Sequence, residues 1–390
     1  MEWNLTTLLH PLSRDLFLSQ YWEKQAVVLP TENKSRFNTL FTWEKLNYLL
    51  NFHRLQYGED VRLVRDGEPL PPGTAKDWLK QMQQGATLIL NHVHELDPSL
   101  AALATQLRYE LGHRVQINLY CTPQEQQGFN CHYDTHEVLV LQLDGEKEWF
   151  ILPETEQFPM KGTRPSNALP PDESPYLKVI LKPGDVLYVP RGHWHYAVPV
   201  GERPSLHLTI GVSTYKGLDW LIWLEKQLQQ KPQWRQSLPL IQDNPQGVKA
   251  HLQALAQELQ DSCWIEDYMK VLRRETGVDV PFSLPEQLGY DLFEQGLETR
   301  FWRSTKQYLQ LKTLEGGMRV YLGKKQLEFQ GDDLAVINWI VRQSEFSLLD
   351  LAEVAPHLDL ETEVVPLLNQ FVMEGIYCVA NCRSICSVSQ

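Results

Sequence analysis

The sequence predicts an α+β protein in which a closed all-β body, a barrel or jelly roll, is followed by a helical region and a small mixed module. Short β-rich runs separated by Pro, Gly and Asp extend from about residue 85 to residue 215, which is typical of such a body. After this point the apolar residues recur at helical spacing instead. At 390 residues the chain is longer than one hydrophobic core usually serves, so we expect two or three domains.

The first predicted domain covers residues 1–215. Its first ninety or so residues alternate helical patterns, such as FTWEKLNYLLNFH, with polar loops. The strands of the β body are expected at the runs TLIL, VQINLY, EVLVLQL, EWFIL, LKVIL, DVLYVP and LHLTIGV. Many short strands joined by turns favour a barrel or a double sheet, because these architectures leave few unpaired strand edges.

The second predicted domain is a helical region, residues 216–310. Its first helical pattern places large apolar residues on one wide face: Leu218, Leu221, Trp223, Leu224 and Leu228. The stretch VKAHLQALAQELQDSCWIEDYMKVLRR continues this pattern. Such faces must be buried, either in the core of the protein itself or at the interface of a homodimer, and both explanations remain open here.

The third predicted domain, residues 318–390, has the order of elements of a winged helix. Two strand-like runs, MRVYL and QLEFQ, precede three helical patterns and a closing IYCVA. From residue 318 onward there are 5 Lys and Arg against 10 Asp and Glu, a net charge of −5. A DNA-binding winged helix should carry a basic stripe. We therefore expect an interaction or structural role for this domain and no nucleic-acid partner.

The whole-chain composition narrows the class of protein further. The formal net charge of −13 argues against nucleic-acid binding and is compatible with a basic protein or peptide as partner. The chain opens without a secretory signal, and no uncharged apolar stretch approaches 18 residues, so we expect no membrane span. Six Cys fit no disulfide framework, and Cys378, Cys382 and Cys386 lack the spacing of a zinc site. A cytoplasmic location is the expectation.

One segment gathers polar residues beside a strand, HYDTHEVLVLQLDGEKEW, from His132 to Trp149. If it were extended throughout, His132, Asp134 and His136 would share one face. A His-x-Asp pair alone is a weak signal, since His357 and Asp359 form another one in the acidic tail.

The pair His132 and Asp134 becomes informative together with a second stretch of the sequence. About sixty residues later the stretch LKPGDVLYVPRGHWHYAV supplies two further histidines after a Pro-Arg-Gly turn. Two imidazoles and one carboxylate with open coordination positions form the facial triad of non-haem Fe(II) oxygenases.

Three stretches resemble the JmjC-type cupin oxygenases of the ribosomal oxygenase group: INLYCTPQEQQGFNCHYDTHEVLVLQLDGEKEW, LKPGDVLYVPRGHWHYA and SLHLTIG. The resemblance implies a double-stranded β-helix, the cupin or JmjC jelly roll, followed by a helical dimerisation region and an acidic winged helix. It also implies a dioxygenase that uses Fe(II), 2-oxoglutarate and O₂ to hydroxylate ribosomal proteins, on arginine in bacteria and on histidine in animals. The loop TPQEQQGFNC departs from the Pro/Gly-rich stretch expected there.

Position by position, the resemblance makes His132, Asp134 and His195 the iron ligands, with the ligand at His195 rather than His193. Lys147 falls where the group places a basic residue that pairs with the distal carboxylate of 2-oxoglutarate. That role would explain a lysine beside a buried strand, because an unpaired buried ammonium is costly. A solvated lysine in a Glu-Lys-Glu turn is the competing interpretation.

The resemblance also suggests further candidate site residues. The resemblance places Asn118, Tyr120, His207 and Thr209 at or near the co-substrate, where ordinary core packing is an equal alternative. His136 is expected at the substrate mouth or on the plain surface. His92 and His94 could join His193 and His195 in a four-histidine cupin site, an arrangement that would leave Asp134 and Lys147 without a purpose.

The function expected from the sequence is hydroxylation of a protein side chain. Two other functions stay open: an oxygenase that tailors a short ribosomally made peptide, and a catalytically silent JmjC-like module that binds partners. The sequence does not identify the substrate or the modified residue, because the residues that contact a substrate lie in variable loops.

Overall fold

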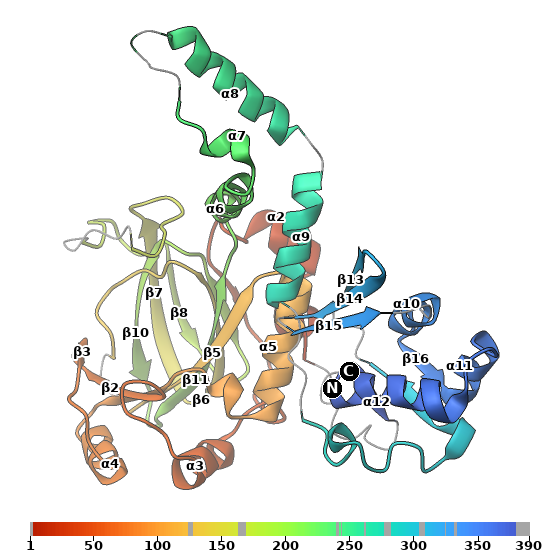
Figure 1. Ribbon diagram of the computed structural model, residues 1–390. Helices are drawn as coiled ribbons and strands as arrows, with labels where there is room; N and C mark the ends of the chain where they lie inside the picture. The colour runs from red at the N-terminus through yellow and green to blue at the C-terminus, as the bar shows by residue number, and fades with distance from the viewer. Residues whose placement is uncertain are drawn as a thin grey trace. The chain divides into compact units, whose positions relative to one another are not determined.

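The structure is a computed structural model. The chain divides into two units between Thr214 and Tyr215 (Figure 1). The described residues are 3–123, 128–162, 169–238, 242, 244–260, 263–276, 282–303, 309–323, 325–330 and 334–379. Within these ranges no helix is both long and apolar enough to cross a membrane. Cys382 and Cys386, weighed above as metal ligands, lie outside them, as does the Gln-Glu-Gln-Gln segment of the unusual loop.

The first unit begins with helices whose starts are fixed by capping side chains. Its helices are α1 (Leu5–Leu9), α2 (Arg14–Gln20), α3 (Trp43–Phe52), α4 (Ala75–Gln83), the short η1 (Val93–Glu95) and α5 (Pro98–Leu111). The side chains of Asn4, Ser13, Thr42 and Asp97 each accept a backbone N–H in the first turn of α1, α2, α3 and α5, which satisfies donors that a helix start leaves unpaired. Helix α5 ends at Gly112, which has a φ of 66°.

Two antiparallel sheets form the β body. The larger has the order β1-β9-β6-β11-β5-β4-β2-β3 and the smaller the order β10-β7-β8. The strands are β1 (Val27–Leu29), β2 (Val61–Arg65), β3 (Glu68–Pro69), β4 (Thr87–Leu90), β5 (Arg114–Thr122), β6 (Glu137–Asp144), β7 (Glu146–Glu154), β8 (Leu177–Leu181), β9 (Val186–Val189), β10 (His193–Val200) and β11 (Ser205–Ser213). All seven runs expected to be strands contribute to these sheets.

The first ninety residues contribute more strand than expected, because β1, β2 and β3 join the larger sheet. These strands have five residues or fewer, too few for a periodicity to stand out from the helical patterns around them. The outer face of the larger sheet and helices α1, α2, α3 and α5 enclose the main hydrophobic core.

The inner faces of the two sheets define the place of the candidate site. Figure 1 shows the smaller sheet facing the larger one. A second core of apolar residues, including Val140, Trp149, Ile151 and Leu187, fills part of the space between them. Polar side chains from β5, β10 and β11 line the remainder.

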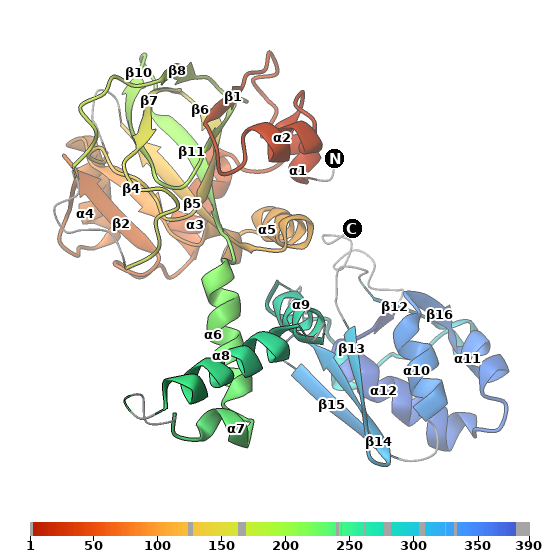
Figure 2. The ribbon, with the colours of Figure 1, turned by 90° about the horizontal axis from the view of Figure 1, so that it is seen from above.

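The second unit starts with helices α6 (Gly217–Leu228), α7 (Pro232–Arg235), α8 (Pro245–Leu259) and α9 (Cys263–Thr276), drawn in green in Figure 2. Of their described residues only Leu224 is buried. Leu218, Leu221 and Ile222 on α6 are 49%, 47% and 53% exposed. Within the described part of this unit, Leu218 and Leu221 of the predicted apolar face therefore stay exposed, whereas Leu224 is buried.

The C-terminal part of this unit has its own core. It contains the short helices η2 (Glu286–Leu288) and η3 (Gly296–Glu298), strands β12 (Arg300–Trp302), β13 (Leu309–Leu314), β14 (Gly317–Leu322) and β15 (Lys325–Gln330), then α10 (Leu334–Arg342), β16 (Glu345–Ser347), α11 (Leu348–Val354), the π-helical η4 (Leu360–Val364), α12 (Val365–Met373) and β17 (Cys378–Val379). The expected order of strands and helices is present, and β13 precedes the two strands that the sequence predicted. Figure 2 shows the β13-β14-β15 sheet beside α10 and α12.

Candidate active site

Three side chains of the kinds that can hold a metal ion meet between the two sheets. One donor atom from each of His132, Asp134 and His195 lies within 4.8 Å of the others, and His195 Nε2 is 3.6 Å from Asp134 Oδ2. The two histidines are brought together by the backbone, because the N–H of His195 donates to the carbonyl of His132 at 2.7 Å and the reverse bond is 3.1 Å. This isolated bridge joins segments more than sixty residues apart in the sequence.

The sequence analysis placed His132 and Asp134 on one face of a strand, and that explanation of their proximity is wrong. The segment from His132 to His136 is not a strand, since β6 begins at Glu137. Asp134 is instead held by Gly192, whose N–H donates to the Asp134 carbonyl at 2.9 Å. Gly192 has a φ of 87°, and a Cβ there would lie 2.9 Å from Cδ of Pro159, so this turn requires glycine.

The hydrogen bonds of the histidine rings favour metal binding through Nε2. His132 Nδ1 lies 2.8 Å from the carbonyl of Asn130, and His195 Nδ1 lies 3.0 Å from the carbonyl of His193. A carbonyl can only accept, so in the neutral ring each Nδ1 carries the proton and each Nε2 has a free lone pair. Burial is the main cause that lowers the pKa of His195 to about 4, which keeps its ring neutral at pH 7.

A cavity of about 350 Å³ opens beside these three residues. All eight predicted site residues line it: His132, Asp134, His195, Lys147, Asn118, Tyr120, His207 and Thr209. Other residues lining it were not predicted as site residues: Arg62, Gln116, Phe129, Val138, Trp149 and Gly211. Tyr196 and Ala197, which follow His195 on β10, also line it.

Lys147 lines this cavity and is 5% exposed. Its ammonium donates to the hydroxyl of Thr122 at 3.2 Å, and no carboxylate among the described residues forms an ion pair with it. Burial lowers the pKa of Lys147 to about 8. The solvated lysine considered above is therefore wrong, and this ammonium is available to a buried anion.

Aromatic rings line the same cavity as Lys147. His207 stacks on Tyr120 with ring centroids 5.0 Å apart, and Trp149 meets His207 edge-on at 5.8 Å. Burial, followed by the charge of Lys147, lowers the pKa of His207 well below its usual value. Nδ1 of His207 is buried and has no hydrogen-bond partner among the residues that the structure describes. We call Lys147, its hydrogen-bond partner Thr122, Tyr120 and His207 the basic cluster.

Asn118 and Thr209 lie opposite one another on β5 and β11. The amide oxygen of Asn118 accepts the backbone N–H of His92 at 2.9 Å. That bond fixes the orientation of the amide and directs its NH₂ group away from His92. Both residues line the cavity.

The remaining histidines separate into different environments. His136 lines the cavity and packs on Gly211, where an added Cβ would lie 2.7 Å from its Cδ2. His193 is buried with its Nδ1 2.7 Å from the hydroxyl of Tyr176. His92, His94 and Glu95 form a second donor group, distinct from that of His195. The four-histidine alternative is therefore wrong.

Alternation along the strands could have identified some of the unpredicted residues. Gln116 has the same parity as Asn118 on β5, and Gly211 the same parity as Thr209 on β11. Arg62 could not be found this way, because its strand β2 was not predicted.

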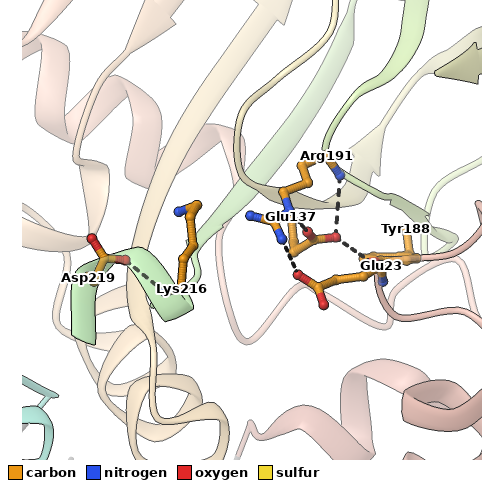
Figure 3. Close-up of polar contacts among 6 residues, drawn as sticks. All are labelled: Glu23, Glu137, Tyr188, Arg191, Lys216 and Asp219. Carbon is orange, nitrogen blue, oxygen red and sulfur yellow. Dashed lines mark hydrogen bonds and ion pairs between the residues drawn. The ribbon is translucent and has the colours of Figure 1, made fainter. Parts of the chain in front are cut away.

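A buried polar network lies next to the site (Figure 3). The Tyr188 hydroxyl donates to the Glu137 carboxylate, and Arg191 Nη2 is 2.6 Å from Oε1 of Glu23. Arg191 Nε also lies 3.5 Å from Oε1 of Glu137. Burial is the largest cause that raises the pKa of Glu137 to about 7, against the opposing effect of the Tyr188 hydrogen bond. The sequence analysis did not identify this network.

Comparison with known protein families places this site in a recognised domain. The JmjC domain matches residues 90–219. The rat protein named ribosomal oxygenase 1 is 35% identical over 234 residues, which are 57% of this chain and 38% of the relative. A Drosophila persimilis protein named bifunctional lysine-specific demethylase and histidyl-hydroxylase NO66 is 30% identical over 284 residues, 66% of this chain and 40% of the relative. The chain thus spans about two fifths of the length of these curated relatives.

Solved structures share the fold over nearly the whole chain. The crystal structure of Escherichia coli ribosomal oxygenase YcfD matches with a TM-score of 0.58 and 16% identity, covering 97% of this chain and 100% of that one. The same E. coli protein in complex with cobalt and 2-oxoglutarate matches with a TM-score of 0.56. At this identity the likeness establishes the mixed α+β JmjC cupin fold.

Proposed function

Because the chain belongs to the JmjC-domain ribosomal oxygenase family, we propose that it is an Fe(II)- and 2-oxoglutarate-dependent dioxygenase that hydroxylates a protein side chain. The observation that carries the proposal is the grouping of His132, Asp134 and His195 around one point, in a cavity that a buried lysine also lines. Two neutral imidazoles and one carboxylate suit Fe(II) and leave coordination positions open. A catalytically silent module would need neither feature.

The residues of the site divide into two binding groups under this proposal. His132 and His195 hold the metal through Nε2 and Asp134 holds it through its carboxylate. The basic cluster binds the distal carboxylate of 2-oxoglutarate, where the Lys147 ammonium supplies the charge and the Thr122 hydroxyl holds that ammonium in place. The orphaned Nδ1 of His207 supports this fit, because a buried polar atom without a partner is costly until a ligand supplies one.

The chemistry comes from the bound groups, since iron with 2-oxoglutarate activates O₂ while the co-substrate is decarboxylated to succinate. The protein's part is to orient both groups and to exclude water. Trp149 and Val138 supply apolar surface to the wall of the cavity.

For the substrate we propose a basic protein or peptide, and specifically a ribosomal protein hydroxylated on arginine or histidine. The family supports a ribosomal substrate, and the formal net charge of −13 favours association with a basic partner.

The proposal is tested by following the co-substrate. Purified protein with Fe(II) and O₂ should convert 2-oxoglutarate to succinate slowly, and faster once a substrate is added. NMR of the reaction mixture measures both compounds. Absence of turnover, together with absence of 2-oxoglutarate binding to the metal-loaded protein, would support the silent module.

We also propose that α6 and its neighbouring helices form a homodimer interface. Leu218, Leu221 and Ile222 are each about half exposed, and a second copy would cover such a face. Light scattering at micromolar concentration should therefore give twice the monomer mass of 45.3 kDa. A monodisperse monomer would contradict the proposal, and Leu221→Glu should shift a dimer toward that state.

The C-terminal domain, which we propose to be winged-helix-like, should not bind duplex DNA. Its net charge of −5 from residue 318 onward offers little cationic surface for the release of counterions. Fluorescence anisotropy with a labelled duplex should show no binding of the full chain at micromolar concentration and physiological salt. Micromolar affinity under these conditions would contradict this expectation.

A further inference from the structure

Glu137 and Arg191 are buried charges that the proposed reaction does not use. Their residues are 0% and 7% exposed, and neither lines the cavity. Burying such ions costs several kcal/mol each, and replacing a buried ion pair by apolar residues is often neutral or even stabilising. Stability of the fold is therefore a weak explanation for this pair.

The contacts of the pair join the two segments that carry the metal-binding residues. Glu137 is the first residue of β6, directly after the loop that contains Asp134. Arg191 lies between β9 and β10, in the turn that leads to His195. The backbone N–H of Arg191 donates to Glu137 Oε2 at 3.4 Å, across 54 positions of sequence, and Figure 3 shows the side chains converging.

The residues that follow Arg191 form hydrogen bonds with the proposed metal ligands themselves. The N–H of Gly192 donates to the carbonyl of Asp134 at 2.9 Å. Three residues further on, His195 forms its two backbone hydrogen bonds with His132. A shift of the turn relative to the start of β6 would therefore move His195 with respect to Asp134.

Glu23 and Tyr188 complete the network from the other side. Glu23 pairs with Arg191 Nη2, and its backbone N–H donates to the Tyr188 hydroxyl at 2.8 Å. The Glu23 side chain is 32% exposed. Arg191 thus has a carboxylate on each side, which restricts the turn in more than one direction.

We infer that Glu137 and Arg191 are positioning residues, which hold the Asp134 loop and the His195 turn at the spacing that a divalent metal requires. The pair acts on metal affinity and on the geometry of the metal site, more than on the stability of the fold. This inference rests on the proposed function, because it needs His132, Asp134 and His195 to bind a metal.

The test replaces the network by apolar side chains. The triple variant Glu137→Met, Tyr188→Phe, Arg191→Met removes the buried charges together. Glu23, whose side chain is already 32% exposed, can then turn to solvent. Co(II) is the probe, because its visible absorption reports both affinity and coordination geometry. We expect Co(II) affinity to fall about 10- to 100-fold, the usual effect of losing support behind metal ligands, with an altered spectrum. The melting temperature of the metal-free protein should change by only a few degrees.

A milder variant and a control complete the design. Glu137→Gln keeps the shape and an acceptor for Tyr188 but removes the charge, and we expect a smaller loss of Co(II) affinity. Lys45→Met with Asp97→Asn removes another ion pair of the same unit, 3.0 Å apart and outside the cavity lining. This control should leave the affinity and the spectrum unchanged.

The outcomes separate the inference from the proposed function. If the wild type binds Co(II) and both network variants match it in affinity and spectrum, the inference is overturned and the proposed function stands. The inference is also overturned if the variants lose only thermal stability in the metal-free form. If the wild type binds no Co(II), the proposed function fails and the inference with it.

Discussion

Replacing His195 by alanine is expected to abolish metal binding and turnover of 2-oxoglutarate. His195 is 5% exposed, and its Nε2 lies 3.6 Å from Asp134 Oδ2, so no other side chain can take its place without a rearrangement of β10. Losing one of three protein ligands should cost more than the 10- to 100-fold typical of supporting residues. We expect a loss of about 1,000-fold or more in Fe(II)-dependent succinate formation, which NMR measures directly.

His193→Ala is the matched control for that variant. The His193 side chain contacts Tyr176, whereas the bond that orients His195 comes from the backbone carbonyl of His193, which alanine retains. This variant should therefore keep metal affinity and measurable activity, with a decline of at most about 100-fold. Loss of the metal in the His193 variant and its retention in the His195 variant would reverse the assignment.

Replacing Lys147 by methionine is the second change with a large expected effect. The proposed partner of its ammonium is the distal carboxylate of 2-oxoglutarate, and a buried carboxylate left without its partner costs about 3–5 kcal/mol. We expect the KM for 2-oxoglutarate to rise by at least about 100-fold, while Co(II) affinity stays near that of the wild type. Isothermal titration with Co(II)-loaded protein measures the binding of 2-oxoglutarate directly. An unchanged KM would contradict the role of Lys147.

The pH dependence of binding provides a separate check on Lys147. Its pKa is lowered to about 8 by burial, so the ammonium is present below that pH and is lost as the pH rises through it. The affinity for 2-oxoglutarate should therefore fall above about pH 8 in the wild type. Lys147→Arg should not show this fall, because a guanidinium stays protonated throughout this range.

The sequence predicted the architecture well where strands were long enough to show a pattern. The β body and the helical region followed from apolar runs and helical periodicity, and the resemblance identified the family correctly. β1, β2 and β3 were missed because their few residues lie among helical patterns. Arg62 was missed with them, since a residue cannot be placed on the inner face of an unpredicted strand.

The structure brings the predicted metal-binding residues together by contacts that the sequence does not reveal. Alternation along a strand was the wrong reason for grouping His132 and Asp134, because β6 starts only at Glu137. The actual causes are the bridge between His132 and His195 and the Gly192 turn. The pairing of Glu137 with Arg191 likewise joins residues 54 positions apart, and no local pattern indicates a contact at that separation.

The measurement that tests the central claim most directly is mass spectrometry of ribosomal proteins incubated with this protein, Fe(II) and 2-oxoglutarate under oxygen-18 gas. The account predicts that one ribosomal protein gains one labelled oxygen atom on an arginine or histidine side chain. An Asp134→Ala variant, which lacks the carboxylate ligand, should produce no such gain. Succinate formation without labelled oxygen in any ribosomal protein would contradict the proposed substrate, and absence of both products would contradict the oxygenase itself.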